Sequence, residues 1–107
     1  MTTFDDRERA FELKFAQDED LKLRLIARRN RLLGEWAGRL MNLSPAETEA
    51  YAKDVIRADF EEAGDDDVIR KILGDLTAAS VEMDEAQIRE QLDHKTAEAK
   101  RQLMSQG

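Results

Sequence analysis

The sequence predicts an all-α protein: an antiparallel four-helix bundle preceded by an additional N-terminal amphipathic helix. The strong helix formers Ala, Leu, Glu, Lys, Arg and Gln dominate the chain. Helix breakers are scarce, with one proline and five glycines among 107 residues. No segment alternates apolar and polar residues with the period of two that indicates a half-buried strand.

The first helix is expected over about residues 3–17. Phe4, Phe11 and Phe15 lie within about 40° of one another at 100° per residue, so they form one narrow aromatic stripe. Leu13 lies on the opposite side. Fifteen residues are marginal for an isolated helix in water. The stripe therefore fits either a helix that docks in a partner's groove or a fifth helix folded back on the bundle, and the residues alone do not decide.

The aromatic stripe ends at Asp18, and a second apolar stripe begins at Leu21, rotated by roughly 60°. Either a hinge lies near 18–20, or one long helix presents two separate surfaces. We favour the hinge, which divides the chain into a docking segment, 1–18, and a bundle domain, 19–107. The second stripe is predicted to comprise Leu21, Leu25, Leu32, Trp36, Leu40 and Leu43.

The bundle helices are predicted over about 19–42, 45–63, 66–79 and 84–104. The sharpest boundary has Ser44 as N-cap, Pro45 at the first helical position and Glu47 completing a capping box. Asp84 with Gln87 makes a similar start for the last helix. Three apolar stripes complete the core: Tyr51, Val55, Ile56 and Phe60; Val68, Ile69, Ile72, Leu73 and Leu76; Ile88, Leu92, Ala99 and Leu103.

Gly64 and the acidic run 65–67 mark the boundary between the second and third bundle helices. Gly64 fits the left-handed position after a helix, and acids suit the positive N-terminal end of the next one. The same acids could suggest a Ca²⁺ or Mg²⁺ site, but the EF-hand spacing is absent. We favour helix capping.

Composition excludes several classes of chemistry. The chain has no cysteine, which excludes disulfides, a thiol nucleophile and thiolate metal sites. The single histidine, His94, lies away from the apolar stripe of its helix, so we expect it on the surface. No nucleophile, base and orienting group can be assembled, and no glycine-rich phosphate loop exists. We predict no enzymatic activity, no catalytic residue, no cofactor and no metal.

Charge and hydropathy limit the partners and the location. The net charge of −7 disfavours nucleic acid. No apolar run is long enough to cross a membrane, and no basic segment followed by an apolar one opens the chain as a signal peptide would. We therefore expect a cytoplasmic protein without direct membrane insertion.

Residues 19–43 are the exception to the acidic balance, with six bases against three acids. Arg28, Arg29 and Arg31 could bind a nucleotide phosphate or another anion. Alternatively they pair with the acidic helices, which we favour. Arg29 and Asp59 both fall inside apolar stripes, which predicts an intramolecular ion pair between them.

The opening Thr3-Phe4-Asp5-Asp6-Arg7-Glu8-Arg9-Ala10-Phe11-Glu12, with Lys14-Phe15, resembles the start of the zeta inhibitor subunit of bacterial F-type ATP synthases. Further matches are Ala27-Arg28-Arg29-Asn30-Arg31-Leu32-Leu33-Gly34 with Trp36-Ala37, Tyr51-Ala52-Lys53, and Ala58-Asp59-Phe60-Glu61-Glu62-Ala63-Gly64-Asp65. The resemblance runs nearly end to end and is most specific in the first 80 residues.

This resemblance implies a four-helix bundle with a mobile N-terminal region that inhibits ATP hydrolysis by the catalytic head of the synthase. The N-terminal segment would enter a catalytic α/β subunit interface, block rotation and also contact the central rotor subunit. The protein would be cytoplasmic and peripheral to the inner membrane through the synthase. The implied partner-binding residues are Phe4, Asp5, Asp6, Arg7, Glu8, Arg9, Phe11, Glu12, Lys14 and Phe15. No role is carried over to residues after Ser80.

An alternative function is a small helical binding or sensor module. It would bind a nucleotide or another anion weakly through Arg28, Arg29 and Arg31. An enzyme of unrecognised type is disfavoured because no catalytic constellation is present.

Overall fold

A computed structural model of the chain describes residues 3–59 and 65–106, with side chains described for 6–58 and 65–105. Five helices follow one another, and the described ranges contain no strand: α1 (Thr3–Gln17), α2 (Glu19–Leu40), α3 (Pro45–Asp59), α4 (Asp66–Ala78) and α5 (Glu85–Gln106). The all-α prediction is confirmed. The predictions for Phe60 and Gly64 fall outside the described residues.

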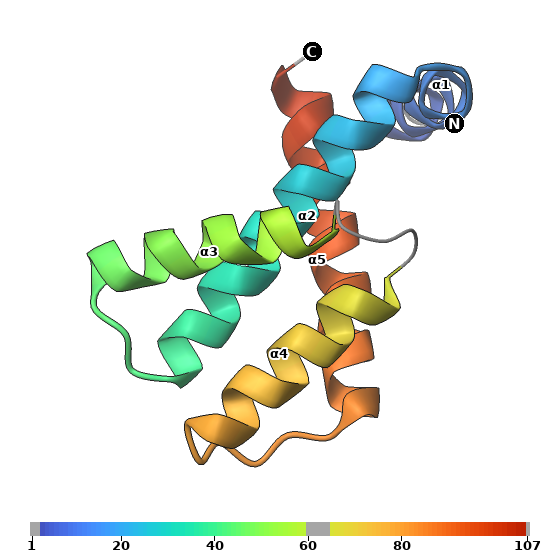
Figure 1. Cartoon of the computed structure of the whole chain (residues 1–107). Helices are drawn as coiled ribbons and strands as arrows, with labels where there is room; N and C mark the ends of the chain where they lie inside the picture. Colours follow the sequence, from blue (N-terminus) through green and yellow to red (C-terminus); the bar gives the residue numbers. More distant parts are fainter. Residues whose placement is uncertain (1–2, 60–64, 107) are drawn as a thin grey trace.

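The four helices α2 to α5 form the bundle. The two longest, α2 and α5, run in opposite directions, and α3 lies across α2 (Figure 1). α2 contacts each of the other three, and α4 closes the bundle against α3 and α5. α1 lies at one end of the bundle, where it contacts α2 and α5.

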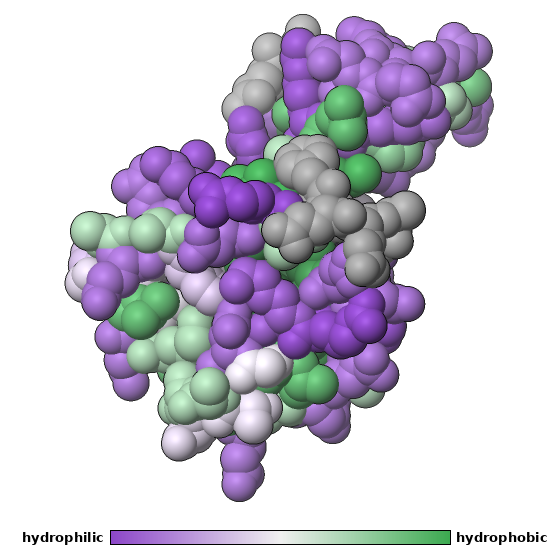
Figure 2. Space-filling view, viewed as in Figure 1, coloured by the Kyte–Doolittle hydropathy of each residue, from purple (hydrophilic) through white to green (hydrophobic). Residues whose placement is uncertain are grey.

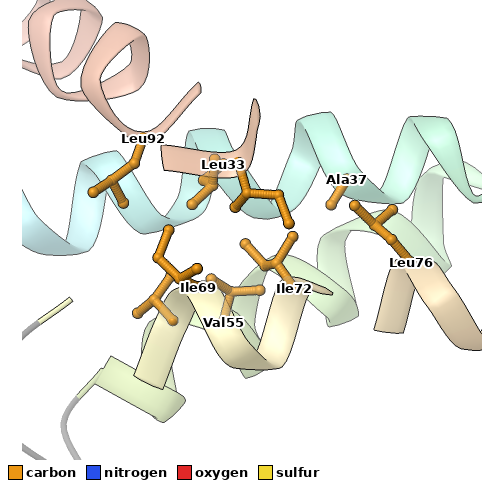
Figure 3. Close-up of a cluster of buried hydrophobic side chains, with 9 residues drawn as sticks. Leu33, Ala37, Val55, Ile69, Ile72, Leu76 and Leu92 are labelled. Atoms are coloured by element: carbon orange, nitrogen blue, oxygen red, sulfur yellow. The ribbon is translucent and has the colours of Figure 1, made fainter. Parts of the chain in front are cut away.

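The core is built from one apolar face of each bundle helix. Figure 3 shows side chains of α2, α3, α4 and α5 converging on a common interior. Its buried members are Leu33, Ala37, Val55, Val68, Ile69, Ile72, Leu76, Ile88 and Leu92. The predicted stripe of α4 is confirmed by four buried residues, and that of α5 by three; Leu73 and Leu103 are half-buried.

The predicted stripe of α2 was only partly right. Leu25 is buried, but Leu32 and Trp36 are half-buried and Leu40 is 36% exposed. The face that packs inside the bundle is rotated toward Leu33. It comprises Leu25, Arg29, Asn30, Leu33, Gly34, Ala37 and Gly38.

Two glycines explain this rotation. A β-carbon on Gly34 would lie 2.7 Å from the Cα of Ala52, and one on Gly38 would lie 2.9 Å from Cγ2 of Thr48. Real β-carbons essentially never come this close to another heavy atom. Glycine therefore lets the backbone of α2 approach that of α3 directly at Gly34 and lets the Thr48 side chain pack onto α2 at Gly38, so the glycine face of α2 must be the one turned inward.

The predicted helix starts are confirmed by their hydrogen bonds. The backbone N–H of Ser44 donates to Glu47 Oε1 at 2.8 Å, and the N–H of Glu47 donates to Ser44 Oγ at 3.2 Å. Asp84 and Gln87 exchange the same pair of bonds at 3.0 and 2.8 Å. These bonds satisfy N–H groups that the first helical turn leaves without intrahelical partners.

Two helices end on a non-glycine residue with a left-handed backbone. Asn42 has a φ of 60° after α2, and Ser80 has a φ of 64° after α4. The next N–H in each case reaches back to the last helical turn, from Leu43 to Gly38 O at 3.1 Å and from Val81 to Leu76 O at 2.9 Å. These are Schellman motifs, which use the last carbonyl groups of the helix.

Candidate functional site

The N-terminal helix and the bundle are separated by a single residue. Asp18 has an extended backbone, with φ −109° and ψ 103°. Its N–H donates to Lys14 O at 2.9 Å, which completes the end of α1. Its side chain accepts a bond from the N–H of Leu21 at 3.1 Å, which caps the start of α2. The predicted break between the two helices is confirmed at Asp18.

One face of α1 is aromatic, as the sequence predicts. The rings of Phe11 and Phe15 stack with centroids 6.4 Å apart and planes 18° apart, and both side chains are half-buried. Leu13, on the other side of the helix, is 62% exposed. The side chains of Phe4 and Asp5 lie outside the described part of the structure, so their predicted roles rest on the sequence.

The contact between α1 and the bundle is thin. Glu12 forms an ion pair with Lys100 of α5. Beside it, Phe11 faces a hollow of about 320 Å³ whose walls include Leu21 of α2 and Leu103 of α5. No described side chain of α1 is fully buried. In Figure 2 the α1 end of the molecule projects from the body as a largely hydrophilic lobe.

The remaining predicted contact residues of α1 are exposed and charged. Among the described residues, none of them has an ion-pair partner: Asp6, Arg7, Glu8, Arg9 and Lys14. Two bases and two acids follow one another directly at 6–9. A charged partner could therefore pair with these side chains without displacing existing ion pairs.

The structure places the three arginines of the basic stretch in different environments. Arg29 is buried, and its Nη1 lies 3.0 Å from Asp65 Oδ1 at the start of α4. Arg28 donates from Nη1 to Gln102 Oε1 of α5 at 2.9 Å. Arg31 is exposed and pairs with Glu35 of its own helix at 3.6 Å. The three therefore do not converge on one anion site.

The predicted pair between Arg29 and Asp59 stays a prediction, because the side chain of Asp59 lies outside the described residues. Arg29 also donates from Nε to Asn30 Oδ1 at 3.0 Å, inside the bundle. The expectation that this arginine pairs within the chain is confirmed through Asp65.

The acidic residues at the start of α4 form ion pairs with arginines. Asp65 is the N-cap residue, but its side chain makes no capping hydrogen bond, so the capping prediction is wrong for this residue. Its carboxylate instead forms an ion pair with Arg29. Asp66 pairs with Arg89 of α5 at 2.8 Å, and the hydrogen bond from Arg89 lowers the pKa of Asp66.

A polar cluster between α3 and α4 had no signal in the sequence, where Tyr51 reads as a core residue. The Tyr51 hydroxyl donates to Asp75 Oδ2 at 2.7 Å, and Lys71 Nζ lies 3.1 Å from the same oxygen. Lys71 also sits 5.2 Å from the centre of the Tyr51 ring. Burial and the bond to Asp75 raise the pKa of Tyr51. The cluster ties two helices together.

The described residues offer little for catalysis. His94 is exposed, as predicted, with Nε2 3.8 Å from Glu90. Within 3–59 and 65–106, no three acidic or histidine side chains gather as metal ligands would. None of the helices in these ranges is long and apolar enough to cross a membrane.

Comparisons with known proteins find a matching family model and a similar solved structure. The family model described as ATPase inhibitor subunit zeta matches residues 1–102. A solved structure, titled a solution NMR structure, is 42% identical to this chain, with a TM-score of 0.72. The similarity covers 81% of this chain and 99% of that one. No curated protein matches the chain.

Proposed function

This chain belongs to the ATPase inhibitor subunit zeta family, a family of regulatory proteins and not of enzymes, and on that basis we propose that it inhibits ATP hydrolysis by an F-type ATP synthase through α1. The proposed docking site is a catalytic α/β subunit interface of the head, next to the central rotor subunit. A helix wedged there would block the rotation that hydrolysis requires. The protein would then be cytoplasmic and held near the inner membrane through the synthase.

The observation that carries this proposal is the make-up of α1. It presents stacked aromatic side chains on one face and, among the described residues, exposed charged side chains that have no ion-pair partner. Helices that dock into grooves bind through such apolar anchors at i and i+4 spacing, with charges fixing orientation. The anchors proposed here are Phe11 and Phe15, together with Phe4 on sequence grounds.

The break at Asp18 supports a division of labour between 1–18 and 19–107. Among the described side chains, the core of the bundle draws its buried residues from α2 to α5 and none from α1. We propose that 1–18 is the inhibitory segment and 19–107 the carrier domain. Deleting 1–18 should abolish inhibition and leave the cooperative thermal unfolding of the bundle intact.

The decisive experiment measures ATP hydrolysis by the purified catalytic head against inhibitor concentration. An aromatic anchor contributes about 2 kcal/mol or more to binding, and 1.4 kcal/mol is a factor of ten. Phe11→Ala and Phe15→Ala should therefore raise the half-inhibitory concentration at least about tenfold. Leu13→Ala is the matched control, because it truncates an exposed apolar residue of the same helix. Equal inhibition by all three variants and the wild type would contradict the proposal.

A further inference from the structure

We propose that the contact of α1 with α2 and α5 is autoinhibitory. In this contact the Lys100–Glu12 ion pair holds the aromatic face of α1 against the bundle, and the pair must open before α1 can dock. The bundle residues that face α1 in this contact are Leu21, Lys100, Leu103 and Met104. The inference rests on the proposed function. It also gives the last helix, α5, a role in regulation.

The ion pair is the polar part of this contact. Lys100 and Glu12 are 88 positions apart in sequence, and their side chains are 29% and 43% exposed. Among the described side chains, this is the one ion pair that joins α1 to the bundle. Partial exposure means that water competes for both charges, so the pair can open readily.

The apolar part of the contact is incomplete. A hollow of about 320 Å³ lies on one side of α1, lined by Phe11, Leu21 and Leu103. A second hollow, of about 460 Å³, lies between Glu8 and α5. Met104 lines both hollows. A helix flanked by open space on two sides gains less from packing than one in a close-packed core.

Intramolecular and intermolecular docking use the same face of α1. Phe11 cannot face the hollow beside Leu103 of α5 and fill a groove in the partner at once. The apparent affinity of the inhibitor is then its intrinsic affinity reduced by the fraction of molecules in which α1 is released. Removing a partly exposed ion pair should raise that fraction, and hence the inhibitory potency, by about two- to fivefold.

The first test uses Lys100→Gln in the full chain. Amide hydrogen exchange in α1 should become faster in the isolated protein, and the half-inhibitory concentration should fall by about two- to fivefold. Lys95→Gln is the control, because Lys95 lies on the same helix and pairs only locally, at 3.9 Å from Glu98. It removes the same charge and should change neither measurement.

The second test locks the contact. The chain has no cysteine, so Ala10→Cys with Met104→Cys, two positions that line the same hollow between α1 and α5, provides one reactive pair for a bifunctional maleimide. The cross-linked protein should lose inhibition, while the same variant without cross-linker retains it.

Three results would overturn the inference. If wild type and Lys100→Gln inhibit with equal potency, the contact does not limit docking, and the proposed function stands. Full inhibition by the cross-linked protein would show the same. Absence of inhibition by wild type, Lys100→Gln and the uncross-linked variant alike would remove the proposed function, and the autoinhibition with it.

Discussion

The direct contact between the backbones of α2 and α3 makes Gly34 the position where the smallest substitution has the largest expected effect. In Gly34→Ala the new β-carbon would start 2.7 Å from the Cα of Ala52 and 3.2 Å from Cγ2 of Val55. Carbon atoms pack at about 3.5–4.0 Å. The two helices must therefore separate by about 1 Å at their crossing, because a backbone atom cannot rotate away.

The magnitude follows from two opposing terms. Overpacking a close-packed core costs about 1–3 kcal/mol, and a clash with backbone belongs at the upper end. Replacing glycine by alanine inside a helix returns about 1 kcal/mol through helix propensity. We expect Gly34→Ala to lose about 2 kcal/mol of unfolding free energy. For a domain of this size that corresponds to a fall in Tm of about 8–16 °C.

The assay is urea and thermal unfolding followed by circular dichroism, with Gly74→Ala as the matched control. Gly74 is exposed in α4, and a β-carbon there would meet nothing within 4 Å. This control should gain up to about 1 kcal/mol. Adding Ala52→Gly should not rescue Gly34→Ala, because it removes a Cβ at 3.3 Å and leaves the Cα at 2.7 Å. A Gly34→Ala protein as stable as wild type would refute the reasoning.

Three further predictions concern polar groups. Tyr51→Phe should lose about 1–2 kcal/mol of unfolding free energy with its bond to Asp75. Because the pKa of Tyr51 is raised above its ordinary 10.0, the stabilisation by the bond to Asp75 is complete below pH 10.0 and is lost as pH rises through the raised pKa. An absorbance titration that shows phenolate forming at the ordinary pKa would contradict this prediction. Hydrogen bonds from Ser44 lower the pKa of Glu47. The difference in urea midpoint between wild type and Glu47→Gln should therefore persist above pH 4.5 and disappear as pH falls through the lowered pKa, and a difference that does not change with pH would contradict this prediction. Arg29→Met should lower the unfolding free energy by about 1–2 kcal/mol, which is less than the loss for leaving a fully buried charge unpaired, because Asp65 is 47% exposed. A double-mutant cycle with Asp65→Asn should show coupling between the two side chains, and additive effects would exclude that coupling.

The helix boundaries could be predicted because local chemistry sets them. Ser44 and Glu47 cap α3 through bonds that span three residues, so the sequence contains both partners. The same holds for Asp84 and Gln87. The break at Asp18 was visible because two apolar stripes change direction there.

The inward face of α2 was less predictable because the residues that decide it are glycines and buried polar side chains, which a hydropathy pattern does not mark as core. Gly34 and Gly38 have no side chain to score, yet their absence of a β-carbon decides where α3 packs. Arg29 and Asn30 are polar and still buried. Their position depends on Asp65 of α4, a partner that only the tertiary structure brings near.

The candidate site followed the same division. The aromatic face of α1 was predictable from the spacing of Phe11 and Phe15, which the stacked rings confirm. The partner of Glu12 was not, because Lys100 lies 88 positions away on a helix that carries several other bases. Long-range pairing of exposed charges has no local signature.

The single residue between α1 and α2 also sets the reach of the N-terminal helix. Fifteen residues at about 1.5 Å per residue make a rod about 22 Å long. Two backbone torsions, φ and ψ of Asp18, suffice to swing its far end over an arc of that radius, while α1 keeps its internal hydrogen bonds. Fixing one joint costs about 1–2 kcal/mol of conformational entropy, whereas ordering fifteen residues from a flexible chain costs that amount for each of them. If α1 leaves the bundle as proposed, a preformed arm on one joint would search a wide volume at little entropic cost on capture.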